Sequence, residues 1–199
     1  AFSNVDLGQD ITLFASGVSN SKEVSLDKYN REINLLQSSL KNSKILIYFS
    51  TCSVIDPHLQ STLYVSHKLS IEKLVLRNKK NIVIRLPQVV GICKNSYTLM
   101  NFLAYKIYNE QTYDLFKGVL RNIIFIEDVV TLTKHIFKDK SSENLFSFNM
   151  PTHYEISEIV SSLEDILGKR SLHNCKKGHP FEYPDSIFIF NAISENIID

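Results

Sequence analysis

Tyr64 and Lys68 are the residues of this sequence whose types and spacing point most directly to chemistry. They stand four positions apart, so on a helix they would share one face. The run Lys44–Phe49, typical of a buried strand, comes before them and is followed by Ser50 and Thr51. A nearby ammonium favours the ionised form of a phenol. With a hydroxyl at the strand end to hold the reacting oxygen, this set predicts acid–base chemistry in carbonyl–alcohol redox reactions.

The Tyr-x-x-x-Lys spacing is short enough to arise by chance, and both residues could simply occupy a half-buried helix face. The order of strand, Ser/Thr turn, helix and further strand favours the functional interpretation. His67 points about 100° away from Lys68 around the helix, so we expect it to be structural or surface-facing. Cys52 has no basic residue beside it in sequence, and we expect a small buried residue there rather than a nucleophile.

Composition excludes several function classes. The chain of 199 residues has a net charge of +1, which gives no electrostatic reason to expect nucleic acid or an anionic membrane as partner. No apolar run is long enough to cross a bilayer. The cysteines Cys52, Cys93 and Cys175 are odd in number and scattered, so we expect free thiols and a cytoplasmic protein. His173 and His179 lie near Cys175, but without paired ligands at tight spacing no metal site is predicted.

Patterns of strand and helix alternate along the chain. We expect strands at 10–14, 43–50, 81–86, 122–126 and 145–148, and helices at 26–41, 62–77, 96–109, 127–137 and 156–167. The tail from Lys169 is expected to be irregular. Strands separated by helices pair in parallel, with helices on both faces. The predicted fold class is therefore α/β, a doubly wound, Rossmann-like parallel sheet, whose ligands bind beyond the carboxyl ends of the strands.

Several short segments along residues 10–168 resemble, in the same order, the motifs of one enzyme family. They are Phe14–Gly17, Tyr29–Asn34 with Asn30, Phe49–Val54 with Thr51, Tyr64–Lys68, Arg85–Gly91, Ile124–Val130 and Phe148–Asn149. With these segments the sequence resembles the extended short-chain dehydrogenase/reductase family, which contains nucleotide-sugar epimerases and dehydratases.

The resemblance implies a cofactor, NAD or NADP, and a nucleotide-diphosphate sugar as substrate, with surface polysaccharide assembly as the setting. It implies that the catalytic residues are Thr51, Tyr64 and Lys68, with Lys68 lowering the pKa of Tyr64 and binding the nicotinamide ribose. The implied cofactor-binding residues are Ala15, Ser16, Gly17, Asn30, Ser50, Tyr64, Lys68, Pro87 and Val89. The implied substrate-binding residues are Cys52, Ser53 and Gln88. Dehydratases typically carry Asp-Glu at the positions of Cys52 and Ser53, so epimerisation or keto-reduction is expected instead.

One motif of the family is absent. The sequence contains no Gly-x-x-Gly-x-x-Gly turn, which holds a pyrophosphate at a helix N-terminus, and the N-terminal strand region is reduced or missing. We expect that turn upstream, with Ala1–Phe2 at the end of its helix. The absence keeps two alternatives open. One is a non-catalytic relative with reduced cofactor binding that acts as a scaffold or regulatory subunit. The other is an α/β interaction domain, which is preferred only if Tyr64 and Lys68 are buried away from any cleft.

The resemblance also divides the chain. Residues 1–92 together with 119–139 are expected to form the Rossmann-like cofactor-binding core, and residues 93–118 and 140–199 the substrate-binding part. Family members often dimerise through the helices that correspond to 26–41 and 62–77. The apolar stripe Ile33, Leu36 and Leu40 is compatible with a homodimer, and equally with packing on the sheet.

Overall fold

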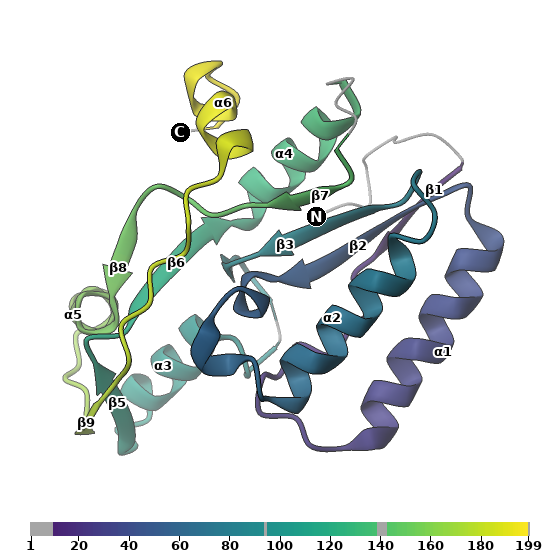
Figure 1. Cartoon of the computed structure of the whole chain (residues 1–199). Helices are drawn as coiled ribbons and strands as arrows, with labels where there is room; N and C mark the ends of the chain where they lie inside the picture. Colours follow the sequence, from purple (N-terminus) through teal and green to yellow (C-terminus); the bar gives the residue numbers. More distant parts are fainter. Residues whose placement is uncertain (1–9, 94, 139–142, 199) are drawn as a thin grey trace.

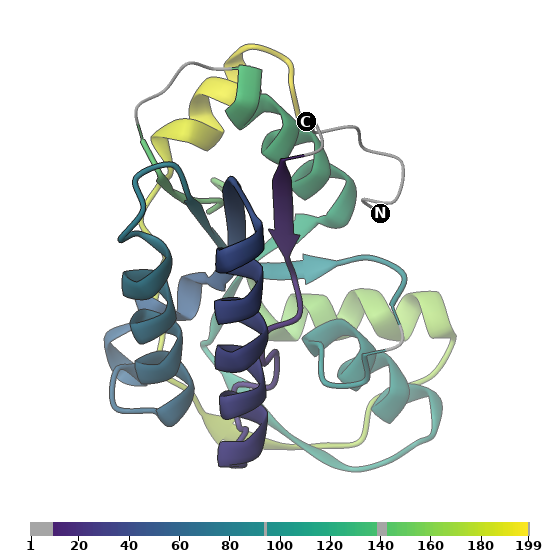
Figure 2. The same ribbon diagram turned by 90° about the vertical axis from the view of Figure 1, so that its right-hand side faces the viewer.

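A four-stranded parallel sheet is the centre of the structure, a computed structural model that describes residues 10–93, 95–138 and 143–198. Its strands, in spatial order, are β1 (Ile11–Phe14), β2 (Ile45–Thr51), β3 (Ile82–Leu86) and β7 (Leu145–Ser147). Helices α1 (Leu26–Asn42) and α2 (Leu63–Val75) cover one face, and α4 (Ile126–Lys138) and α6 (Ile187–Ser194) the other (Figures 1 and 2). The predicted doubly wound α/β fold is confirmed.

The alternation of side chains along β2 and β3 explains why both faces of this sheet are covered. Successive side chains of a strand point to opposite faces. Leu46 and Tyr48 of β2 pack with α1 and α2, whereas Ile47 packs on the other side with α4 and α6. In β3, Val83 and Ile84 divide in the same way. Two apolar cores thus hold the sheet rigid beneath its carboxyl ends.

The apolar stripe of α1 that would be compatible with a dimer packs against the sheet instead. Leu36 is fully buried in the core under α1 and α2, and Ile33 and Leu40 pack against that core. The apolar residues that α1 leaves exposed are Leu26 and Leu35. The homodimer stays a prediction that this stripe does not support.

A second group of elements follows the third strand. It contains β4 (Gln88–Val90), α3 (Leu99–Tyr108), β5 (Tyr113–Lys117), β6 (Leu120–Phe125), β8 (His153–Glu155), α5 (Ile156–Leu167) and β9 (His173–Lys177). Strands β4, β6 and β8 form a three-stranded sheet in that order, and β5 pairs in parallel with β9. Between β2 and α2 lie two single-turn 3₁₀ helices, η1 (Cys52–Val54) and η2 (Pro57–Leu59). Figure 1 shows α3, α5, β5 and β9 beyond the carboxyl ends of the main strands.

The prediction of an irregular tail after Lys169 is wrong. β9 and α6 both lie there, and α6 buries Ile189 and Ala192 against the main sheet. The helix begins at the side chain of Ser186, which accepts a hydrogen bond from the N–H of Ile189 at 3.4 Å. Its run of apolar residues has no polar face, so it lacks the 3.6-residue period by which a surface helix is recognised.

The proposed division of the chain into two parts stays a prediction. β7 and α6 lie within 140–199, yet β7 pairs with β3 and α6 packs on the same sheet. The expectation for Ala1–Phe2 falls outside the described residues. Among the described residues, no helix is both long and apolar enough to span a membrane.

Candidate active site

The carboxyl end of β2 and the first turn of α2 bring Thr51 and Tyr64 together. Thr51 ends β2, and its hydroxyl oxygen accepts a hydrogen bond from the N–H of Ser53 at 3.1 Å, which begins η1. Helix α2 begins in the same way, because Thr62 accepts a bond from the N–H of Val65 at 3.2 Å. These two caps fix the end of the strand and the start of the helix, and the Thr51 side chain lies close enough to the Tyr64 phenol to lower its pKa.

Lys68 lies one turn further along α2 and is almost completely buried. Its ammonium nitrogen donates hydrogen bonds to Oε1 of Glu32 at 3.0 Å and to the hydroxyl of Tyr48 at 2.9 Å. The same nitrogen lies 5.7 Å from the centroid of the Tyr64 ring. Lys68 therefore faces the ring of Tyr64, and its two hydrogen bonds go to groups on α1 and β2.

Glu32 of α1 is the buried partner that holds Lys68. Its side chain is fully buried, and its carboxylate accepts hydrogen bonds from four groups. The donors are the N–H of Val18 at 2.7 Å, the hydroxyl of Tyr48 at 2.7 Å, and Lys68 and ring nitrogen Nε2 of His67 at 3.0 Å each. Burial on its own raises the pKa of Glu32, but the bond with His67, the charge of Lys68 and the other two bonds lower it to about 2.

Folding stability is expected to fall as the pH drops from about 4.5 to about 2, because Glu32 has its ordinary pKa of 4.5 only when unfolded. A depressed pKa stabilises the fold above the unfolded value, and this stabilisation is lost as Glu32 protonates. The shift corresponds to a free energy on the order of 3 kcal/mol. Urea unfolding at several pH values in this window checks it. In Glu32→Gln the free energy of unfolding should depend less on pH, whereas in Glu182→Gln, a change at an exposed position, it should depend on pH as in the wild type. The same pH dependence in all three proteins would contradict the assignment.

Two sequence-based expectations about this network need correction. Asn30, which the resemblance places beside the cofactor, lies on the exposed side of α1, and Glu32 is the α1 residue that faces Lys68. His67 is buried, so its surface-facing alternative is wrong and its structural role is right: it binds Glu32 and packs against the ring of Tyr29, centroid to centroid 4.5 Å. A signal for Glu32 was present in sequence, because it lies three residues after Tyr29 on the buried face of α1.

The expected effect of Lys68 on the pKa of Tyr64 is also not found. Burial raises the pKa of Tyr64 to about 12; the hydrogen bond with Thr51 lowers it, and the charge of Glu32 raises it further. The ammonium of Lys68 is paired with Glu32, so its field at the phenol is largely cancelled. In this structure Tyr64 is a neutral phenol at pH 7.

The loop after β1 closes over the Lys68 ammonium. Ala15 and Ser16 are exposed, whereas Gly17 is half-buried. A Cβ at position 17 would lie 2.7 Å from both Nζ of Lys68 and Oε1 of Glu32. Any side chain at position 17 would push the ends of Lys68 and Glu32 aside, so glycine favours this close approach. The cofactor-binding role of Gly17 stays a prediction.

Ser50 and the β3–β4 segment complete the predicted cofactor set. Ser50 is buried and donates a hydrogen bond of 2.5 Å to Glu72, which also binds Arg85 through both carboxylate oxygens. Ser50 thus serves this buried ion pair. Pro87 and Val89 are half-buried and lie at the end of β3 and in β4.

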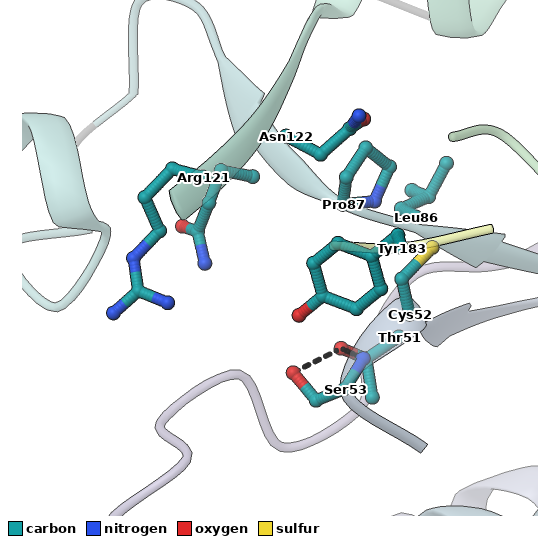
Figure 3. A pocket seen from close by; sticks show the side chains of 9 residues that line it. Thr51, Cys52, Ser53, Leu86, Pro87, Arg121, Asn122 and Tyr183 are labelled. Atoms are coloured by element: carbon teal, nitrogen blue, oxygen red, sulfur yellow. Dashed lines mark hydrogen bonds between the residues drawn. The ribbon is translucent and has the colours of Figure 1, made fainter. Parts of the chain in front are cut away.

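A pocket opens beside Thr51, at the carboxyl ends of β2 and β3 (Figure 3). Its lining residues are Thr51, Cys52, Ser53, Leu86, Pro87, Gln88, Arg121, Asn122 and Tyr183. The three predicted substrate-binding residues are therefore brought together. Cys52 is fully buried, as expected, and burial raises the pKa of its thiol. Neither Tyr64 nor Lys68 lines this pocket, and both are buried; Thr51 is the lining residue that approaches Tyr64. Their burial keeps open the alternative of an α/β interaction domain.

Sequence reasoning missed four pocket residues, which are Leu86 of β3, Arg121 and Asn122 of β6, and Tyr183 before α6. In Figure 3 the hydroxyl of Tyr183 points towards Ser53, whose side chain partly offsets the rise that burial causes in the pKa of Tyr183. Arg121 and Asn122 stand at the start of a predicted strand, and their polar character was the available signal. Nothing local marks Tyr183.

Arg121 gives the pocket a free cation. Its Nε atom is buried and has no hydrogen-bond partner among the described residues. Burial lowers the pKa of its guanidinium, and Tyr183 and Asp56 oppose that effect. A guanidinium stays charged in proteins and prefers carboxylate or phosphate oxygens. The pocket can thus receive an anionic group at Arg121.

Comparisons with known proteins bear on this arrangement. No protein-family model matches the sequence, and no curated protein matches it. Among solved structures, UDP-glucuronic acid 4-epimerase from Bacillus cereus, in complex with UDP-glucuronic acid and NAD, has a TM-score of 0.71 at 19% identity, over 93% of this chain and 68% of that one. UDP-glucose 4-epimerase from Thermus thermophilus, in complex with NAD, has a TM-score of 0.71 at 12% identity, over 95% of this chain and 72% of that one.

A dehydratase is similar to the same degree. dTDP-glucose 4,6-dehydratase from Bacillus anthracis, in complex with NAD, has a TM-score of 0.69 at 14% identity, over 93% of this chain and 66% of that one. The fold is that of the extended short-chain dehydrogenases/reductases. At these identities the likeness is one of fold, so the chemistry must be argued from the residues.

The residues of this extended short-chain dehydrogenase/reductase fold match one half of a nicotinamide cofactor. Lys68 has three N–H groups, and two of them bind Glu32 and Tyr48. The third can donate to a ribose hydroxyl, next to the phenol of Tyr64. For the pyrophosphate half, the sequence contains no Gly-x-x-Gly-x-x-Gly turn. The nicotinamide ribose therefore fits the donors present, and the phosphates have no such turn in these 199 residues.

Proposed function

We propose that the protein is an NAD(P)-dependent, oxidoreductase-type enzyme that acts on a nucleotide-diphosphate sugar, as an epimerase or a keto-reductase. The observation that carries the proposal is the approach of the Thr51 hydroxyl to the Tyr64 phenol, with Thr51 lining a pocket beyond the carboxyl ends of β2 and β3. Ligands of open α/β sheets bind at this edge. The fold neighbours, whose structures contain NAD and UDP-sugars, support the same substrate class.

Tyr64 would exchange a proton with the sugar oxygen at the reacting carbon. The cofactor supplies or accepts the hydride. Because the pKa of Tyr64 is raised to about 12, its resting form is the phenol, which suits protonation of a carbonyl oxygen. Thr51 would hold the same oxygen in position. The protonation state thus favours keto-reduction as the first step.

The pocket is narrow as it stands. Its cavity volume is about 10 Å³, far below the range of roughly 300–1,000 Å³ typical of ligand sites, so its lining must open to admit a sugar. Ser53 and Gln88 would then offer hydrogen bonds to sugar hydroxyls, and the guanidinium of Arg121 would bind a phosphate of the diphosphate or a sugar carboxylate.

Arg121→Gln is expected to weaken binding of a UDP-sugar by about 10- to 100-fold, the size of a lost charge-assisted hydrogen bond. Isothermal titration calorimetry with UDP-glucose and UDP-glucuronic acid measures the dissociation constants. Arg31→Gln, an equal change at an exposed position of α1, is the control and should bind normally. Equal affinities for the three proteins would remove Arg121 from the binding site.

A second function is favoured by one observation. Lys68 is buried and paired with Glu32, and its field at Tyr64 is cancelled. A relative that has lost catalysis and serves as a scaffold or regulatory subunit would tolerate such pairing. In that case the protein would bind nucleotide sugar without converting it.

The deciding experiment is an assay of conversion. The protein is incubated with NAD⁺ and UDP-sugars, or with NADPH and a UDP-4-keto sugar, and products are resolved by anion-exchange chromatography. Formation of an epimer or a reduced sugar, dependent on the cofactor, supports the enzyme. Binding of the sugar nucleotide with no product from any of these mixtures supports the scaffold.

The predicted homodimer and cytoplasmic location belong to the same proposal. Light scattering at micromolar concentration would rule out the dimer if it gave the monomer mass.

A further inference from the structure

The surroundings of Lys68 are unusual for a lysine. Its side chain is only 3% exposed, and every element packed on it contributes a group that faces it. These groups are Glu32 of α1, Tyr48 of β2, Tyr64 and Glu72 of its own helix α2, and the main chain at Gly17 after β1. Among them Glu32 supplies the hydrogen-bonded negative charge.

Without the charge of Glu32, burial would favour the neutral amine of Lys68 over the ammonium. A fully buried lysine can have its pKa lowered by about 3–5 units, which makes the amine largely neutral near pH 7. For Lys68, burial is the largest influence and lowers the pKa, while the charge and hydrogen bond of Glu32 raise it; Glu72 adds a smaller effect. The ionised state of Lys68 therefore depends on one carboxylate.

The geometry fixes that carboxylate in place. Oε1 of Glu32 binds both Lys68 and Tyr48, and Oε2 binds His67 and the N–H of Val18. The donors come from β2, α2 and the loop after β1, so rotation of the Glu32 side chain would break bonds to three segments. A carboxylate held this way orients its partner as well as neutralising it.

We propose that Glu32 is a positioning residue, which keeps Lys68 a charged ammonium and holds it between the ring of Tyr64 and the main chain at Gly17. The inference deepens the proposed function, and rests on it for what Lys68 then does to a cofactor. The ionisation of Lys68 itself can be measured without any cofactor, so the two ideas fail separately.

A purely structural role would also explain a buried Glu32, and the test must separate the two. Glu72 provides the matched control, since it is equally buried on the next turn of α2 but pairs with Arg85 and Ser50. Glu32→Gln and Glu72→Gln each remove one buried carboxylate charge with little change of shape. Both should lower stability, but only the first should change the titration midpoint of Lys68 by a large amount.

The experiment is a pH titration of the whole chain labelled with [ε-¹³C]lysine, read by NMR, with the Lys68 signal assigned by its absence in Lys68→Met. In the wild type the Lys68 signal should be that of the ammonium at neutral pH, and in Glu32→Gln its midpoint should fall by about two pH units or more. Glu72→Gln should shift it by much less. An unchanged midpoint in Glu32→Gln, or equal shifts in both variants, would overturn the inference.

The inference can still be tested if Glu32→Gln does not fold, because a measurement on the wild type alone can contradict it. A wild-type Lys68 that is already neutral near pH 7 would show that Glu32 does not keep it charged. Absence of NADH binding in a wild type whose Lys68 titrates as described counts against the proposed function alone.

Discussion

Tyr64→Phe is expected to lower the turnover of a nucleotide sugar by about 10²–10⁴-fold, the usual contribution of a general acid or base. The phenol is the proton donor in the proposed reaction, and it lies beside Thr51, which lines the pocket. Phenylalanine keeps the ring and its packing beside Lys68 but has no proton to give. Turnover under saturating substrate is the quantity to measure, since the hydroxyl contributes mainly to the chemical step.

Tyr97→Phe is the matched control, because Tyr97 is 70% exposed and removal of its hydroxyl should leave turnover unchanged. Thermal unfolding of both variants shows whether the loss is chemical. A Tyr64→Phe protein that is folded and retains more than about a tenth of wild-type turnover would exclude Tyr64 as the proton donor.

Lys68→Met is expected to destabilise the fold by about 3–5 kcal/mol, the cost of leaving a buried charge without its partner. Methionine fills much of the same space, so packing is largely preserved. Glu32 would remain fully buried and would lose the ammonium that its carboxylate binds. Chemical denaturation at neutral pH measures the free energy of unfolding.

The double variant Glu32→Gln/Lys68→Met separates charge from packing. Removal of both charges should restore most of the lost stability, since replacing both members of a buried ion pair is often neutral. Lys79→Met, a change at an exposed lysine, should have little effect. If the double variant were as unstable as the sum of the single ones, the ion pair would not be the cause.

Much of the fold could be predicted from the sequence because its signals are local. Each strand of the main sheet carries a short apolar run, and α1 and α5 carry a helical stripe, so their positions follow from periodicity. Thr51 and Tyr64 are thirteen positions apart, but one strand end and one helix start place them together. The short strands β4, β5, β8 and β9 have three to five residues each and too little pattern to be found.

The partners of Lys68 and the far wall of the pocket could not be predicted, because they depend on contacts distant in sequence. Glu32 meets Lys68 across 36 positions, and only the packing of α1 beside α2 brings them together. Tyr183 reaches the pocket through a segment without regular structure. The sequence-based expectation for the pKa of Tyr64 has the wrong sign for the same reason, since that pKa depends on burial and on Glu32.

Cofactor binding at Lys68 and Tyr64 is the central claim, and a titration with NADH and NADPH tests it most directly. The protein has no tryptophan, so the fluorescence of the reduced cofactor can be followed without that background. A saturable change is predicted for the wild type, weakened at least about tenfold in Glu32→Gln/Lys68→Met, which keeps the fold but removes the ammonium. No saturable change up to about 1 mM cofactor with a folded wild type, or equal binding by the double variant, would contradict the account.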